Sequence, residues 1–89
     1  MYRIETTSEF DKQFRKLDRS VQIMIRKWIG KNLTGEGDPR AHGKPLSAQL
    51  KGLWRYRIGD YRLLADIRDD ELVIVAVEIN HRSRVYKSR

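Results

Sequence analysis

Three arginines in the second half of the chain, Arg55, Arg57 and Arg62, have the residue type and spacing to bind one anion. They lie in two stretches that alternate between apolar and polar residues, and the pair Gly59-Asp60 between these stretches suits a two-residue hairpin turn. A guanidinium group binds phosphate through two parallel hydrogen bonds, a geometry that lysine lacks. The arginines therefore indicate an anion site, and phosphate is the anion that fits them best.

A two-residue turn at Gly59-Asp60 also determines which residues of the hairpin face one another. Arg57 is expected opposite Arg62, and Arg55 opposite Leu64, so the three arginines share one face of the sheet. The apolar residues expected on the other face, beneath the helices, are Trp54, Tyr56, Ile58, Tyr61, Leu63, Ala65 and Ile67. Like charges directly opposite one another destabilise a sheet. The arginine face is therefore either an anion site or a solvated face on which the arginines splay apart.

An imidazole, arginines and a tyrosine come near the end of the chain, where residues 80–86 read Asn-His-Arg-Ser-Arg-Val-Tyr. If Asp69-Asp70 is a second two-residue turn, Arg62 lies opposite Val77 and His81 shares the arginine face, although a slip of one residue would reverse this. Histidine is the side chain that ordinarily exchanges a proton near neutral pH. His81 is therefore a candidate for proton transfer, with a solvated or structural histidine as the alternative.

The composition describes one small basic domain over residues 1–89. The chain has 19 Lys and Arg residues against 12 Asp and Glu residues, which gives a net charge of +7 and a pI of about 10.1. The lack of cysteine excludes disulfides and thiolate metal sites. No apolar run is long enough for a membrane span or a signal peptide, so we expect a cytoplasmic protein. The positive charge favours an anionic partner, nucleic acid first and an acidic protein second.

The elements that position these residues follow from the periodicity of the sequence. Residues 2–6 alternate and favour a short strand. Ser8 and Asp11 then resemble a capping box that begins a helix. The apolar stripe of this helix consists of Phe10, Phe14 and Leu17.

A second helix is expected to begin at Asp18 or Ser20 and to end at Gly35. Its apolar stripe consists of Val21, Met24, Ile25, Trp28 and Ile29. Because only two or three residues separate the two helices, they should form an antiparallel hairpin. The loop over residues 34–40 connects this hairpin to the strands, and His42 just beyond it is interpreted as incidental.

The second half of the chain changes to the period of a strand. Residues 53–58 and 61–67 alternate, and residues 72–77 form an unbroken apolar run that suits a central strand covered on both faces. The predicted fold class is therefore α+β in the order β-α-α-β-β-β. A helical hairpin packs on a mostly antiparallel four-stranded sheet in this prediction.

Several segments of the sequence resemble the RelE/ParE toxins of bacterial and archaeal type II toxin–antitoxin modules. They are Lys-Pro-Leu at 44–46, Leu-Trp-Arg-Tyr-Arg-Ile-Gly-Asp-Tyr-Arg-Leu at 53–63, the long apolar strand, and His-Arg-Ser-Arg-Val-Tyr at 81–86. The resemblance spans essentially the whole chain and includes the helical hairpin. The central segment is shared by the nuclease and gyrase-directed branches, whereas the His-Arg-x-x-Val-Tyr ending favours the RelE-like branch that cleaves mRNA.

The resemblance implies a ribosome-dependent endoribonuclease, an mRNA interferase that cuts in the ribosomal A site and inhibits translation. The ribose 2′-hydroxyl attacks the adjacent phosphodiester and leaves a 2′,3′-cyclic phosphate, with no metal and no other cofactor. The implied partners are the ribosome, mRNA and a cognate antitoxin of acidic or amphipathic character. The implied assembly is a toxin–antitoxin hetero-oligomer, and no membrane is involved.

The resemblance and the residue chemistry together assign roles to eight residues. The catalytic candidates are Arg62, His81, Arg82 and Tyr86, although Tyr86 could equally pin the chain end. The RNA- or phosphate-binding candidates are Arg55, Arg57, Arg84 and Lys87. The best-known member of the family has lysines at the positions of Arg55 and Arg57, and arginine stays protonated in proteins. The general-base role therefore does not carry over to Arg55 and Arg57, and either His81 does acid or base work or the ribosome supplies part of the acid–base chemistry.

Two other functions remain open at the level of sequence. One is a ParE-like inhibitor of DNA gyrase, which would damage DNA and leave translation intact. The other is a catalytically weak module that binds RNA or an antitoxin through its basic face, with no cleavage product under any condition.

Overall fold

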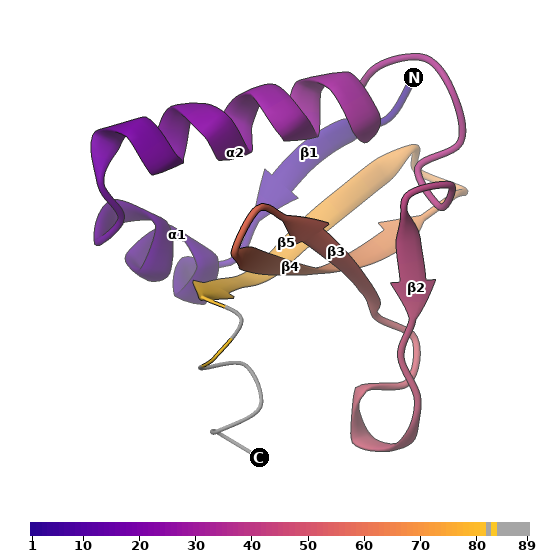
Figure 1. Ribbon diagram of the computed structural model, residues 1–89. Coiled ribbons are helices and arrows are strands. Elements are labelled where there is room, and N and C mark those ends of the chain that lie inside the picture. Colours follow the sequence, from indigo (N-terminus) through magenta and orange to yellow (C-terminus); the bar gives the residue numbers. More distant parts are fainter. Residues whose placement is uncertain (82, 84–89) are drawn as a thin grey trace.

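The computed structural model describes residues 1–81 and residue 83 (Figure 1). The strands are β1 (Arg3–Thr6), β2 (Gly43–Pro45), β3 (Trp54–Ile58), β4 (Tyr61–Arg68) and β5 (Val73–His81). The helices are α1 (Ser8–Arg15), α2 (Arg19–Asn32) and the short 3-10 helix η1 (Ala48–Leu50). The strands lie in the order β1-β5-β4-β3-β2, with β1 parallel to β5 and the other neighbours antiparallel. The predicted α+β class and the mostly antiparallel sheet are confirmed.

The sheet has five strands where the sequence predicted four. The additional strand is β2, which is three residues long and pairs with β3 so that Lys44 lies opposite Arg55. The sequence did not predict β2 as a strand, because glycine and proline are both depleted in strands. Gly43 is needed here, since a Cβ atom at this position would lie 2.7 Å from the ring of Tyr56.

The two predicted helices form and are joined by a short connection, but their ends differ from the prediction. The N-cap of α1 is Thr7, whose hydroxyl accepts a hydrogen bond from the Phe10 amide at 3.1 Å, so the expected capping box at Ser8 does not form. The same hydroxyl donates to the carbonyl of Val77 at 2.8 Å, which ties the start of α1 to β5. α2 ends at Asn32 and therefore stops before Gly35.

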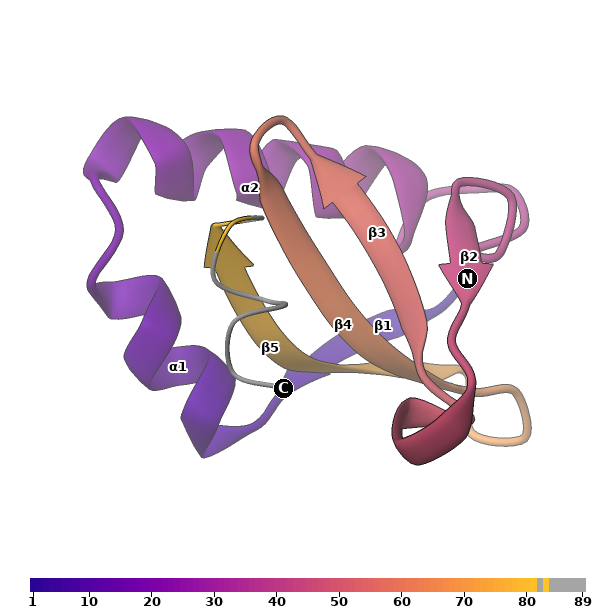
Figure 2. The ribbon, with the colours of Figure 1, turned by 60° about the horizontal axis from the view of Figure 1, so that its bottom comes forward.

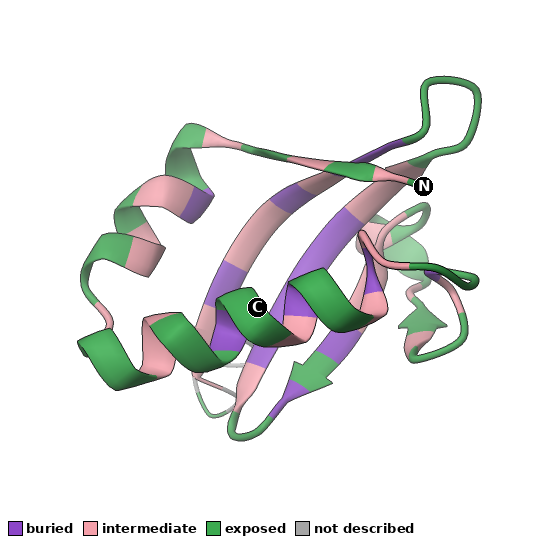
Figure 3. Ribbon diagram, turned by 90° about the horizontal axis from the view of Figure 1, so that it is seen from above, coloured by how far each residue is buried: buried purple, intermediate pink, exposed green. Residues whose placement is uncertain are grey.

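The core lies between the helical hairpin and one face of the sheet, where Figure 3 shows α2 crossing in front of the buried segments of the central strands. Its buried members are Phe10, Ile25, Ile29, Leu33, Tyr56, Ile58, Leu63, Ala65, Ile74, Ala76 and Ile79. Trp54, Tyr61 and Ile67 pack against this cluster, so the predicted apolar face of the β3–β4 hairpin is confirmed. Figure 2 shows β3 and β4 from the other side, where neither helix covers the sheet. Within the described part of the chain, no helix is long and apolar enough to cross a membrane.

Candidate functional site

The β3–β4 hairpin brings three predicted site residues together. Arg57 lies opposite Arg62 and Arg55 lies opposite Leu64, as the sequence predicted. Gly59 in the turn has a φ of +59°, a conformation that glycine adopts without steric cost and that two-residue hairpin turns require. Because alternate residues of a strand point to opposite faces, the three arginines lie on the face away from the helices.

Arg62 differs from its neighbours in burial. Its side chain is only 8% exposed, and it is the one charged residue in the buried class among those that the structure describes. Arg57 is exposed, and Arg55 is half-buried. Arg62 lies on β4 between β3 and β5, with Arg57 on one side and Asn80 on the other. A guanidinium held in this way is preorganised to stabilise negative charge with little rearrangement.

The predicted register between β4 and β5 is wrong. β4 ends at Arg68 and β5 begins at Val73, so the connection spans residues 69–72 and is longer than two residues. A β-bulge between Leu64 and Ala65 then shifts the pairing once more. Arg62 consequently lies opposite Asn80 and not opposite Val77.

This register places His81 on the opposite face of the sheet from the three arginines. His81 lies opposite Tyr61, and the two rings meet edge to face with their centroids 5.5 Å apart. The Nδ1 atom of His81 lies 3.0 Å from the hydroxyl oxygen of Ser83. The expectation that His81 shares the arginine face is therefore wrong, and His81 lies on the helix side at the end of β5.

A polar hollow of about 440 Å³ surrounds this end of β5. Its lining residues are Gln13, Lys16, Leu17, Tyr61, Ile79, Asn80, His81 and Ser83. Gln13 is held in place, since its side-chain oxygen accepts a hydrogen bond from the Ile79 amide at 2.8 Å. Asn80 both lines the hollow and lies opposite Arg62, so the hollow adjoins the arginine face.

A second, smaller hollow was not foreseen from the sequence. It has a volume of about 200 Å³ and is lined by His42, Lys44, Arg55 and Arg57. His42 was interpreted as incidental, and Lys44 was not singled out because β2 was not predicted as a strand. The available signal was the Lys-Pro-Leu segment at 44–46, which contains Lys44 directly before the proline.

Comparison with known proteins gives the chain its family. The sequence model of the family described as "ParE toxin of type II toxin-antitoxin system, parDE" matches residues 4–86. The chain belongs to this toxin family. The predicted membership of the RelE/ParE superfamily is therefore confirmed.

The toxin is also similar to individual proteins of the superfamily. It is 29% identical to Toxin RelG of Mycobacterium tuberculosis over 86 residues, and this aligned region covers 97% of each of the two chains. The structure matches a chain of the Mycobacterium tuberculosis toxin–antitoxin complex RelBE2 with a TM-score of 0.83 and 29% identity over 92% of both chains. It matches the isolated Escherichia coli RelE toxin with a TM-score of 0.73 and 20% identity, over 99% of this chain and 94% of that one. The last likeness concerns the fold alone.

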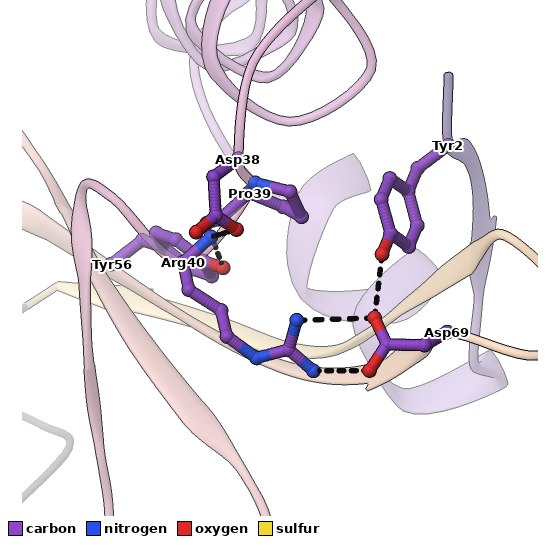
Figure 4. Close-up of polar contacts among 6 residues, drawn as sticks. All are labelled: Tyr2, Asp38, Pro39, Arg40, Tyr56 and Asp69. Atoms are coloured by element: carbon purple, nitrogen blue, oxygen red, sulfur yellow. Dashed lines mark hydrogen bonds and ion pairs between the residues drawn. The ribbon is translucent and has the colours of Figure 1, made fainter.

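The loop of the toxin that leads from α2 to β2 is fastened to the sheet at several points (Figure 4). The two terminal guanidinium nitrogens of Arg40 donate to the carboxylate of Asp69, at 3.0 and 2.8 Å, and the Tyr2 hydroxyl donates to the same carboxylate at 2.5 Å. The hydrogen bonds from Arg40 and then from Tyr2 lower the pKa of Asp69. The buried Tyr56 hydroxyl donates to the carbonyl of Pro39 at 2.6 Å, and burial raises the pKa of Tyr56 to about 12, so it remains a donor.

Four of the eight predicted site residues lie outside the described part of the toxin. They are Arg82, Arg84, Tyr86 and Lys87. Their assigned roles therefore stay predictions. In the part of the chain that the structure describes, no group of three or more His, Cys, Asp or Glu residues could hold a metal ion.

Proposed function

We propose that the toxin is a ribosome-dependent endoribonuclease that cleaves mRNA in the ribosomal A site and thereby arrests growth. The observation that carries this proposal is the buried guanidinium of Arg62 on a face that also bears Arg55 and Arg57. Attack by a ribose 2′-hydroxyl on a phosphodiester adds negative charge to the phosphorus centre. Preorganised cations around that centre are the kind of group that lowers such a barrier.

Within this proposal the arginines and the histidine have separate tasks. Arg62 stabilises the charge that develops on the phosphorane, and Arg57 opposite it binds the same or an adjacent phosphate. The exposed end of β5 is where His81 would exchange a proton with a substrate that reaches around the edge of the sheet. If the substrate stays on the arginine face, the ribosome supplies the acid–base groups and the toxin acts by orienting the reactants.

The partners proposed for this toxin are the ribosome, mRNA and an antitoxin encoded with it. Support for the antitoxin comes from the solved complexes that the fold resembles, the RelBE2 complex of Mycobacterium tuberculosis and the RelBE complex of Escherichia coli. The net charge of +7 favours an antitoxin with an acidic segment. A toxin–antitoxin hetero-oligomer follows from this pairing.

A second candidate function is inhibition of DNA gyrase, as in the gyrase-directed, ParE-like branch of the superfamily. The observation that favours it is the match of residues 4–86 to the ParE toxin family. A third candidate is a module that binds RNA or antitoxin without cleaving. Only the first candidate produces cleaved mRNA, so one experiment separates it from the other two.

The experiment is primer extension on a reporter mRNA in a reconstituted translation system, with and without ribosomes. New 3′ ends within codons that appear only with ribosomes are the expected result. Intact mRNA together with normal translation would contradict the nuclease and direct attention to gyrase supercoiling assays. Cleavage without ribosomes would mean that this chain holds all the proton-transfer groups, and His81→Gln would then be the variant to compare.

A further inference from the structure

The arginine face continues onto β2, the strand that the sequence did not predict. Lys44 lies directly opposite Arg55, and Arg57 lies directly opposite Arg62. Residues in such pairs have Cβ atoms about 4.5–5.5 Å apart, and like charges at this separation destabilise a sheet. Two like-charged pairs on neighbouring strands therefore concentrate positive charge on this face of the sheet, which suits it to an anionic ligand.

The hollow between β2 and β3 has the size and charge for one compact anion. All four described residues that line it, His42, Lys44, Arg55 and Arg57, are basic. Its volume of about 200 Å³ is smaller than the ~300–1,000 Å³ of sites that enclose a drug-sized molecule. A phosphodiester group fits this combination, because it is small, carries one charge and offers oxygen atoms to several donors.

His42 is held at this hollow by a chain of aromatic contacts. Its ring lies edge to face with Trp28 at 6.5 Å, and Trp28 lies edge to face with Tyr56 at 5.5 Å. The Tyr56 hydroxyl in turn holds the loop before His42 through the carbonyl of Pro39. The exposed imidazole therefore rests against Trp28 at the edge of the sheet, where a ligand in the hollow can reach it.

We propose that His42, Lys44, Arg55 and Arg57 form a second phosphate subsite next to Arg62. The subsite binds the phosphodiester that neighbours the reacting one, so single-stranded RNA lies across β2, β3 and β4. Arg57 belongs to both subsites, because it lines the hollow and lies opposite Arg62. The choice of RNA as the ligand rests on the proposed function, whereas the position of the subsite rests on the four residues.

The test is the binding of a short 2′-O-methyl oligoribonucleotide, which lacks the attacking hydroxyl, measured by fluorescence anisotropy over a series of KCl concentrations. Removing one phosphate contact to a single strand lowers the salt slope by about 0.7, which corresponds to about fivefold weaker binding at 0.1 M salt. Lys44→Gln is expected to show this loss, and Lys44→Arg to retain wild-type affinity. His42→Phe keeps a ring against Trp28 and is expected to weaken binding about fivefold through the lost donor. Lys51→Gln, an exposed lysine outside the hollow, is the matched control.

The outcomes separate the subsite from the proposed function. Wild-type affinity in Lys44→Gln and His42→Phe with unchanged melting temperatures, or no binding by the wild-type toxin at low salt, would overturn the subsite. Equally strong competition by poly-glutamate would also overturn it and favour an acidic protein as the ligand. If no mRNA is cleaved on ribosomes but the two variants still weaken binding, the endoribonuclease proposal fails and the subsite stands.

Discussion

Arg62 combines two properties that rarely occur together in one side chain. It carries a permanent charge and is 8% exposed, whereas charged side chains are almost never fully buried unless they are paired. Its neighbours across the sheet are Arg57 on β3 and Asn80 on β5. A fixed guanidinium in such surroundings is suited to receive the oxygen atoms of a substrate.

Arg62→Gln is expected to lower the single-turnover rate of mRNA cleavage on ribosomes about 10²–10³-fold, which is the usual effect of removing one group that stabilises transition-state charge. Arg62→Lys should fall between Arg62→Gln and the wild type, since lysine keeps the charge and loses the bidentate geometry. Arg19→Gln on the exposed surface of α2 is the control. A wild-type cleavage rate in Arg62→Gln would show that Arg62 does not stabilise the transition state.

Tyr56 links the core to the loop before β2. Tyr56→Phe removes the donor to the carbonyl of Pro39 and leaves that acceptor buried, because both residues are buried. The free energy of unfolding is expected to fall by about 1–3 kcal/mol, measured by urea denaturation. Tyr2→Phe removes a hydroxyl from an exposed hydrogen bond and should have a smaller effect. An equal loss of unfolding free energy in Tyr56→Phe and Tyr2→Phe would contradict the argument that burial makes the Tyr56 hydrogen bond the more important one.

At the scale of elements, β2 is the strand on which the candidate subsite depends. Gly43→Ala would bring a Cβ atom to 2.7 Å from the Tyr56 ring, so β2 must move away from β3. We expect a loss of about 1–3 kcal/mol in unfolding free energy from this overpacking, together with weaker oligonucleotide binding. Gly30→Ala in α2 is the matched control, because its Cβ atom would meet nothing within 4 Å. It should be neutral or stabilise the toxin by up to about 1 kcal/mol. Unchanged stability in Gly43→Ala would mean that the ring of Tyr56 can yield.

The elements also show which parts of the site the sequence could predict. The β3–β4 hairpin was predictable because Gly59-Asp60 is a strong turn signal and the flanking residues alternate without interruption. The register between β4 and β5 was not predictable from the sequence, because Leu72 has the apolar character of the strand residues that follow it and is predicted to be the first residue of that strand. In the structure it has a φ of +54° and belongs to the turn. The bulge after Leu64 adds a further shift that no residue type marks, and His81 changes face as a result.

At the scale of the whole molecule, one cluster connects three segments that are far apart in the sequence. Asp69 in the β4–β5 turn binds Arg40 of the loop before β2 and Tyr2 near the N-terminus (Figure 4). These contacts are exposed, so salt weakens them. These contacts fix the positions of the three segments relative to one another and add little to the free energy of unfolding.

The cluster predicts a dependence of stability on acid pH. Because hydrogen bonds from Arg40 and Tyr2 hold the pKa of Asp69 below its ordinary value of 3.8, the folded state favours the ionised carboxylate. This contribution is present above about pH 4 and is lost as the pH falls through the lowered pKa. The difference in unfolding free energy between the wild type and Asp69→Asn should therefore shrink below pH 4. A difference that stays constant from pH 6 to pH 3 would contradict this assignment.

The position of β2 at the end of the strand order has a consequence for local opening of the toxin. β2 is an edge strand of three residues that pairs with β3, whereas β4 and β5 are long and lie inside the sheet. Short edge elements open at a small fraction of the free energy of global unfolding. The backbone amides of Gly43 and Lys44 should thus exchange with deuterium long before those of β4. Hydrogen exchange would then report ligand binding directly, because an RNA strand held across β2 and β3 slows this opening.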